Sequence, residues 1–67
     1  MGKCYEVTAI IRATEANSEF YQFVDKLRIG GLIKEEVLDT AEQAFLDKHD
    51  TDLMEVVDVI LVDIKEL

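Results

Sequence analysis

The chain has 67 residues, 49% of which are apolar, and a net charge of −8. This length predicts that residues 1–67 form one small domain of marginal stability, and the apolar content excludes a disordered chain. The negative charge argues against direct binding to nucleic acid or anionic membranes. Basic protein surfaces are the partners that such a charge favours.

The charge is divided unevenly along the chain. Residues 1–34 carry four acidic and five basic side chains, whereas residues 35–67 carry eleven acidic side chains and only two bases, Lys48 and Lys65. No apolar run approaches the roughly 20 residues of a membrane span, and the first residues lack the apolar core of a signal peptide. The single cysteine, Cys4, is compatible with a reducing compartment. We therefore expect a cytoplasmic protein.

Residues 3–13 alternate as a β-strand does, with four apolar side chains on one face: Tyr5, Val7, Ala9 and Ile11. Residues 14–18 then read as a turn. The next apolar side chains recur at the i, i+3, i+4 and i+7 spacing of an amphipathic helix: Phe20, Phe23, Val24 and Leu27. Gly30 is well placed to end this helix, and Asp25 and Arg28 are expected to pair on its outer side.

Residues 32–50 allow two interpretations. The favoured one is a helix over residues 34–48, because the apolar spacing is helical and nearly every residue is a good helix former. Glu35 and Glu36 would then lie in its first turn, where the helix dipole stabilises carboxylates. The alternative starts the helix at Thr40, where Gln43 has the spacing of a capping box, and makes residues 32–38 a strand.

Residues 53–65 predict a final strand that is apolar on both faces. In strict alternation, one face carries Ile60, Val62 and Ile64, and the other carries Val57, Val59 and Leu61. The first set is expected to lie under the helices. Asp58 falls on that same face, so either it lies beyond the helices or a β-bulge turns it outward.

The resulting fold class is α+β, a small β-α-α-β two-layer domain. Two antiparallel strands would be covered on one face by a helical hairpin. A two-stranded ribbon has two unpaired edges and one bare face, so dimerisation is expected to complete it. The competing interpretation is a large binding surface for another protein. The residues predicted at the dimer interface are Ile10, Val57, Val59 and Leu61.

No motif predicts catalysis or a resident cofactor. Cys4 and His49 are the only cysteine and histidine, and they are far apart in the sequence. The acidic turn at residues 47–55 does not match a calcium loop, because the glycine and the spacing of the last glutamate are wrong. The glycines of residues 28–34 do not have phosphate-loop spacing. We therefore expect a non-enzyme without metal or cofactor, with a solvent-exposed His49.

The most informative feature is a series of carboxylates along the second predicted helix. Glu35, Asp39 and Glu42 recur at i, i+4 and i+7, which places like charges side by side at a small energetic cost. The series continues into the following turn and is here called the acidic ridge: Glu35, Glu36, Asp39, Glu42, Asp47, Asp50 and Asp52. Carboxylates about 5–6 Å apart imitate the phosphates of a nucleic-acid backbone and attract a basic groove. Its alternative role is solubility alone.

Three functions fit these observations. The favoured one is an acidic protein that binds and blocks a basic site on a larger protein, such as a nucleic-acid-binding enzyme. In size, acidity and absence of catalytic motifs, the chain resembles phage or mobile-element inhibitors of the anti-CRISPR or anti-restriction type, which mimic nucleic acid. The alternative is a homodimeric structural or assembly module. A less favoured third function is a small-ligand sensor or sponge, with polar contacts from Tyr5, Arg12 and Tyr21.

Overall fold

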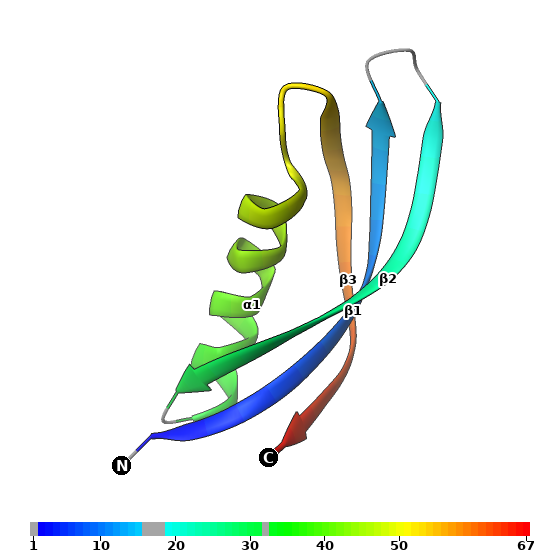
Figure 1. Ribbon diagram of the computed structural model, residues 1–67. Helices are drawn as coiled ribbons and strands as arrows, with labels where there is room; N and C mark the ends of the chain where they lie inside the picture. The colour runs from blue at the N-terminus through cyan, green and yellow to red at the C-terminus, as the bar shows by residue number, and fades with distance from the viewer. Residues whose placement is uncertain (1, 16–18, 32) are drawn as a thin grey trace.

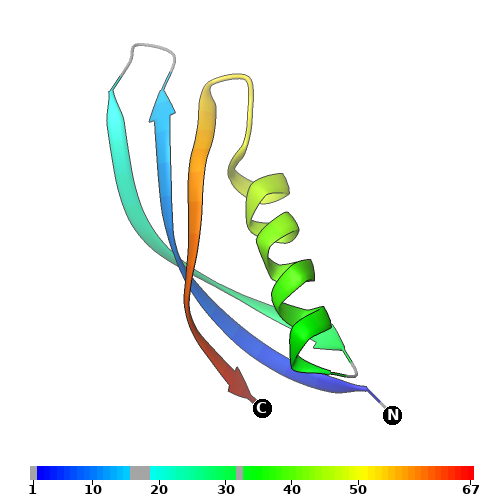
Figure 2. The same cartoon turned by 180° about the vertical axis from the view of Figure 1, so that it is seen from behind.

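The computed structural model describes residues 2–15, 19–31 and 33–67. The elements follow the order β1 (Lys3–Glu15), β2 (Phe20–Gly31), α1 (Lys34–His49) and β3 (Met54–Glu66). The sheet order is β2-β1-β3, and the central strand β1 is antiparallel to both neighbours. Helix α1 lies on one side of this twisted sheet, and the end of β1 and the start of β2 extend beyond the last turn of α1 (Figure 1, Figure 2).

The α+β two-layer class is therefore correct, but the predicted β-α-α-β order is wrong. Residues 20–31 form a strand, so the described part of the chain has three strands and a single helix rather than two strands and a helical hairpin. Thr14 and Glu15 belong to β1 instead of a turn, and residues 16–18 of that predicted turn lie outside the described residues.

Strand β2 has an alternation that the helical spacing obscured. Its inward side carries aromatic and aliphatic side chains with one acid among them: Tyr21, Phe23, Asp25, Leu27 and Ile29. Asp25 interrupts this stripe, so the sequence shows the helical period more clearly than the period of two. Pairing decides between them, because β1 has two edges of backbone donors and acceptors that need partners. Gly30 lies within β2 opposite Cys4 and ends no helix.

Helix α1 forms as the favoured interpretation predicted, and neither a start at Thr40 nor a strand over residues 32–38 occurs in the described residues. Glu35 and Glu36 lie in the first turn and Lys48 and His49 in the last, so the charges at both ends complement the helix dipole. The residues from Asp50 to Leu53 lead into β3, close to the predicted start of the last strand.

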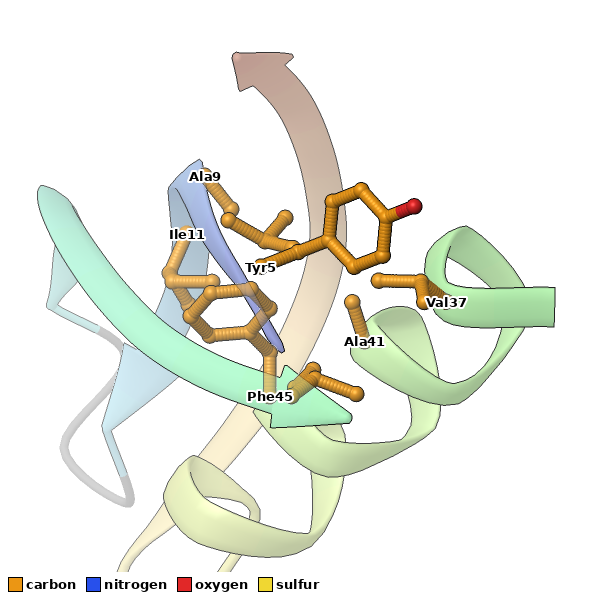
Figure 3. Close-up of a cluster of buried hydrophobic side chains, with 8 residues drawn as sticks. Tyr5, Ala9, Ile11, Val37, Ala41 and Phe45 are labelled. Atoms are coloured by element: carbon orange, nitrogen blue, oxygen red, sulfur yellow. The ribbon is translucent and has the colours of Figure 1, made fainter. Parts of the chain in front are cut away.

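The core is a thin layer between α1 and β1. The helix contributes side chains at i, i+4 and i+8, namely Val37, Ala41 and Phe45, all of which are fully buried. They pack on the inward face of β1, on the alternating side chains predicted from the sequence: Tyr5, Val7, Ala9 and Ile11. Ala13 is also buried on this face. Figure 3 shows the Phe45 ring beside Ile11, with Val37 near Tyr5. Small side chains at Ala9 and Ala41 let the helix approach the sheet closely.

Strand β3 contains two register shifts that sequence alternation could not reveal. Along β1, Thr8 pairs with Asp63 but Ala9 pairs with Leu61, so Val62 is left out of the ladder. A second shift omits Val57, because Arg12 pairs with Asp58 and Ala13 with Val56. Each β-bulge places one extra residue on β3 and reverses its alternation at that point.

The bulges reassign the two faces of β3. The residues packed against the core are Val56, Val59, Leu61 and Ile64. Of the three predicted under the helix, only Ile64 is there, since Ile60 and Val62 are exposed. The alternative in which a bulge turns Asp58 outward is confirmed, because Asp58 is exposed and lies opposite Arg12.

Candidate protein-binding surfaces

The acidic ridge forms an exposed surface on the outer side of α1 and the loop after it. All seven of its residues are exposed, and its five helical members lie away from the buried stripe of Val37, Ala41 and Phe45. Among the described residues, none of the seven forms a salt bridge. Asp47 accepts a hydrogen bond from Gln43 at 2.9 Å, which leaves its charge uncompensated.

The lysine in the last turn of α1 does not offset this charge, because Lys48 turns toward the sheet. Its Nζ donates a hydrogen bond to Asp25 Oδ2 of β2 at 2.8 Å, and His49 Nε2 lies 2.6 Å from the same oxygen. The Lys26 amide donates to the other oxygen of Asp25 at 2.8 Å. Desolvation is the largest single influence and raises the pKa of Asp25, but these three hydrogen bonds outweigh it and hold the pKa below its usual value.

The predicted pairing of Asp25 with Arg28 is wrong for the same reason that β2 is a strand. Their positions differ by three residues, so they lie on opposite faces of β2. Asp25 faces α1, whereas Arg28 is exposed on the other side of the sheet with its Nε 4.0 Å from Glu6.

The prediction of a solvent-exposed His49 is wrong. Its side chain is only 16% exposed, and its ring meets Phe23 edge-on at 5.0 Å between centroids. Cys4 is an exposed free thiol near the start of β1. Within the described ranges, no cluster of three or more His, Cys, Asp or Glu side chains is arranged to hold a metal ion.

The second surface is the face of the sheet that α1 does not cover, here called the open face. A row of three apolar side chains crosses its middle, because Ile10 of β1 pairs with Val24 of β2 and with Ile60 of β3. Val24 is 64% exposed and Ile60 is 38% exposed. On one side of this row Arg12 Nε donates to Gln22 Oε1 at 3.1 Å.

The structure divides the residues predicted for a dimer interface. Ile10 is half-buried on the open face, and Val57 is 59% exposed at a bulge. Val59 and Leu61 lie on the opposite side, packed against the core under α1, so the four do not share one surface. Sequence reasoning missed Val24, which it placed in a helical core, and Ile60, which it placed under the helices. The pairing of both residues with Ile10 identifies them as part of the open face.

The residues predicted to contact a small ligand are also separated. Tyr5 is buried on the helix side, and Tyr21 pairs with Ala13 on that same side, whereas Arg12 lies on the open face. A hydrogen bond to Glu19 raises the pKa of Tyr21. At the other end of the sheet, a hydrogen bond to Glu66 raises the pKa of Lys3.

An open groove of about 400 Å³ lies between the first turns of α1 and the second half of β3. It is lined by four apolar residues and by one charged residue from each element: Lys34, Leu38, Leu61, Val62, Asp63 and Ile64. The groove belongs to neither the acidic ridge nor the open face.

The described residues include no helix with both the length and the apolar character required to cross a bilayer. Comparison with known proteins returned no matching family model, no matching curated protein and no matching solved structure.

Proposed function

We propose that this chain is a small non-enzymatic protein that inserts its acidic ridge into a basic site on a larger protein and blocks that site. The observation that carries the proposal is the isolation of the ridge from positive charge. Lys48, which follows Asp47 in the chain, is drawn to Asp25, and Lys34 stands at the first position of α1. A surface that served only solubility would mix both signs of charge.

The shape of the ridge supports a nucleic-acid-binding site as the target. Helix α1 has 16 residues and is therefore about 24 Å long, with neighbouring carboxylates about 5–6 Å apart. A convex, rigid row of negative charge fits a groove that normally holds a phosphate backbone, and long-range attraction would speed its association.

This mode of action is that of a phage or mobile-element inhibitor of the anti-CRISPR or anti-restriction type, and we propose the cytoplasm as its location. A non-enzymatic role is supported by the residues that could have carried catalysis. Cys4 is exposed near the start of β1, and His49 is held by Asp25 and Phe23.

The second candidate function is a homodimeric structural or assembly module. The observation that favours it is the apolar row across the open face, which α1 leaves uncovered. It does not compete with the first function, because the acidic ridge and the open face lie on opposite sides of the sheet.

The test of the proposed function is capture of nucleic-acid-binding proteins from a lysate of the source cells by the immobilised chain. We expect a captured protein to be released by double-stranded DNA and by rising salt, since both compete for a basic site. The charge-reversed variant Asp39→Lys with Glu42→Lys should lose the capture. The lysine introduced at position 39 would lie four residues after Glu35 and form a favourable i, i+4 ion pair with it. Helix α1 should therefore still fold.

The matched control is Asp58→Lys with Asp63→Lys, which changes the net charge equally on the open face, on the side of the sheet opposite the acidic ridge. This control should retain the captured protein. Equal loss from both variants would show that net charge alone is recognised. Capture that DNA cannot reverse would overturn mimicry of nucleic acid.

A further inference from the structure

The open face combines an uncovered apolar centre with flanks of opposite charge. The row Val24–Ile10–Ile60 forms the centre. On β2, the charged side chains of this face are Lys26 and Arg28, and both are exposed. On β3, the corresponding side chains are mainly acidic, with one base near the end of the strand: Glu55, Asp58, Asp63 and Lys65. The face is therefore basic along one edge and acidic along the other.

From this distribution we infer that the open face binds a second copy of the chain, around a two-fold axis that runs along β1. Such an axis lays β2 of each copy over β3 of the other, so the basic edge meets the acidic edge twice. Val24 then faces Ile60 of the second copy, and the two Ile10 side chains meet on the axis. A two-fold interface of this kind needs a surface that is complementary to itself.

The alternative two-fold axis, perpendicular to the strands, is disfavoured by charge. It would place β3 over β3 and bring Asp63 of one copy over Asp58 of the other. It would also place Lys26 over the uncharged Gln22, and its one favourable pair would be Lys65 over Glu55. With the axis along β1, Lys26 instead faces Asp63 of the second copy.

The inferred axis also brings like charges together. The two Arg12 side chains meet on the axis, with Asp58 of both copies beside them. The least complementary row is the one that contains Arg28, Glu6 and Lys65, where the two Glu6 side chains also meet. In this arrangement Arg28 would face Lys65 of the second copy. Along β1, the Glu6 row lies two residues from Thr8 and four residues from Ile10 at the apolar centre. Two twisted sheets that stack face to face approach most closely at their centre and diverge toward their corners, so repulsion there is weakened by distance and solvent.

Pairing through the free edge of β3 is less favourable, because the bulges at Val57 and Val62 interrupt the row of backbone donors and acceptors that such pairing requires.

Sedimentation equilibrium of the whole chain over a concentration series tests the contact. We expect a dimer, and we expect Val24→Asp and Ile60→Asp each to raise its dissociation constant at least about tenfold, because each places carboxylates in the apolar centre. Both side chains are exposed in the single chain, so the substitutions should leave the circular dichroism spectrum unchanged. The matched control is Leu53→Asp, at a residue that is 75% exposed in the loop before β3, and it should leave the dimer intact.

A charge exchange tests the direction of the axis. Lys26→Asp and Asp63→Lys should each weaken the dimer, and the double variant should restore it, because the pair between copies is re-formed with the signs exchanged. A wild-type chain that stays monomeric up to about 1 mM would overturn the inference. A dimer that survives Val24→Asp, or a double variant no tighter than the single variants, would overturn it as well. These outcomes are independent of the acidic ridge, which both copies would present outward.

Discussion

At the scale of single residues, Asp25 joins β2 to the end of α1. It is a carboxylate on the inward side of a strand, where burial alone would be unfavourable. The ammonium of Lys48, the ring of His49 and the amide of Lys26 satisfy its oxygens. The same residue hid the alternation of β2 in the sequence, so a tertiary contact explains both its location and the error in prediction.

The lowered pKa of Asp25 predicts a loss of stability in acid. Its folded-state pKa lies below the unfolded value near 3.8, so its contribution is complete above that value and is lost as the pH falls through the folded pKa. Asp25→Asn should lower the free energy of unfolding by about 1–2 kcal/mol at pH 7 and flatten its decline below pH 4. Urea unfolding at several pH values measures this.

The control for this prediction is Asp39→Asn, which removes an exposed carboxylate of the acidic ridge. It should change the free energy of unfolding by less than about 0.5 kcal/mol at pH 7. If the free energy of unfolding of Asp25→Asn declined below pH 4 as steeply as that of the wild type, the role given to Asp25 would be contradicted.

Gly31 is a second position where one residue matters, because α1 starts close to the end of β2. A Cβ added there would lie 2.5 Å from Val37 Cγ2. Gly31→Ala should therefore cost about 1–3 kcal/mol of stability, and much less when Val37→Ala has removed the opposing methyl groups. Chemical denaturation of the four proteins of this double-mutant cycle gives the coupling energy.

The neighbouring glycine is the control for that cycle. A Cβ at Gly30 would lie 3.6 Å from the Lys3 carbonyl oxygen, which is an ordinary contact. Gly30→Ala should change the stability by less than about 1 kcal/mol. If Gly31→Ala cost the same in the wild type and in Val37→Ala, contact between position 31 and the Val37 methyl groups would not limit how closely α1 approaches β2.

At the scale of elements, β3 shows how bulges make a two-sided apolar strand one-sided. Strict alternation places Val57 and Val59 on the same face. The bulge at Val57 separates them, so Val57 is 59% exposed and Val59 packs against the core. As a result, Asp58 and Asp63, which lie opposite Arg12 and Thr8 of β1, point away from the helix.

These two valines therefore provide a matched comparison within one strand. Val59→Ala should destabilise the fold by about 1–2 kcal/mol, because it removes methyl groups from the partly buried core. Val57→Ala should cost less than about 0.5 kcal/mol. Thermal unfolding at protein concentrations below the dissociation constant of the dimer measures the cost of each substitution. Equal costs would contradict the bulged register.

At the scale of the whole molecule, nine buried apolar residues within the described ranges form the core. A chain of 67 residues is expected to have only about 3–10 kcal/mol of total stability. The charges are arranged around this thin core so that the acidic ridge and the mixed-charge open face lie on opposite sides. Each surface is thus available to a different partner.

The thin core predicts that one large truncation unfolds the monomer. Phe45→Ala removes the largest fully buried side chain and should cost about 3–5 kcal/mol, which is comparable to the total stability. We expect loss of the cooperative unfolding transition in circular dichroism. Leu53→Ala, at an exposed loop position, should keep the wild-type transition, and a cooperative Phe45→Ala protein would show that the core extends beyond α1 and β1.

The sequence by itself determined β1, α1, β3 and the acidic ridge. The local periods of β1 and α1 match their structures, as in the alternation of Tyr5, Val7, Ala9 and Ile11 and the helical spacing of Val37, Ala41 and Phe45. For β3, the apolar composition predicted a strand but not which face each residue occupies. Only the tertiary structure decided that residues 20–31 are a strand, that Val57 and Val62 are bulged, and that Ile10, Val24 and Ile60 meet. These features depend on which backbone groups pair across the sheet, and pairing joins residues far apart in the chain, where no local period can report it.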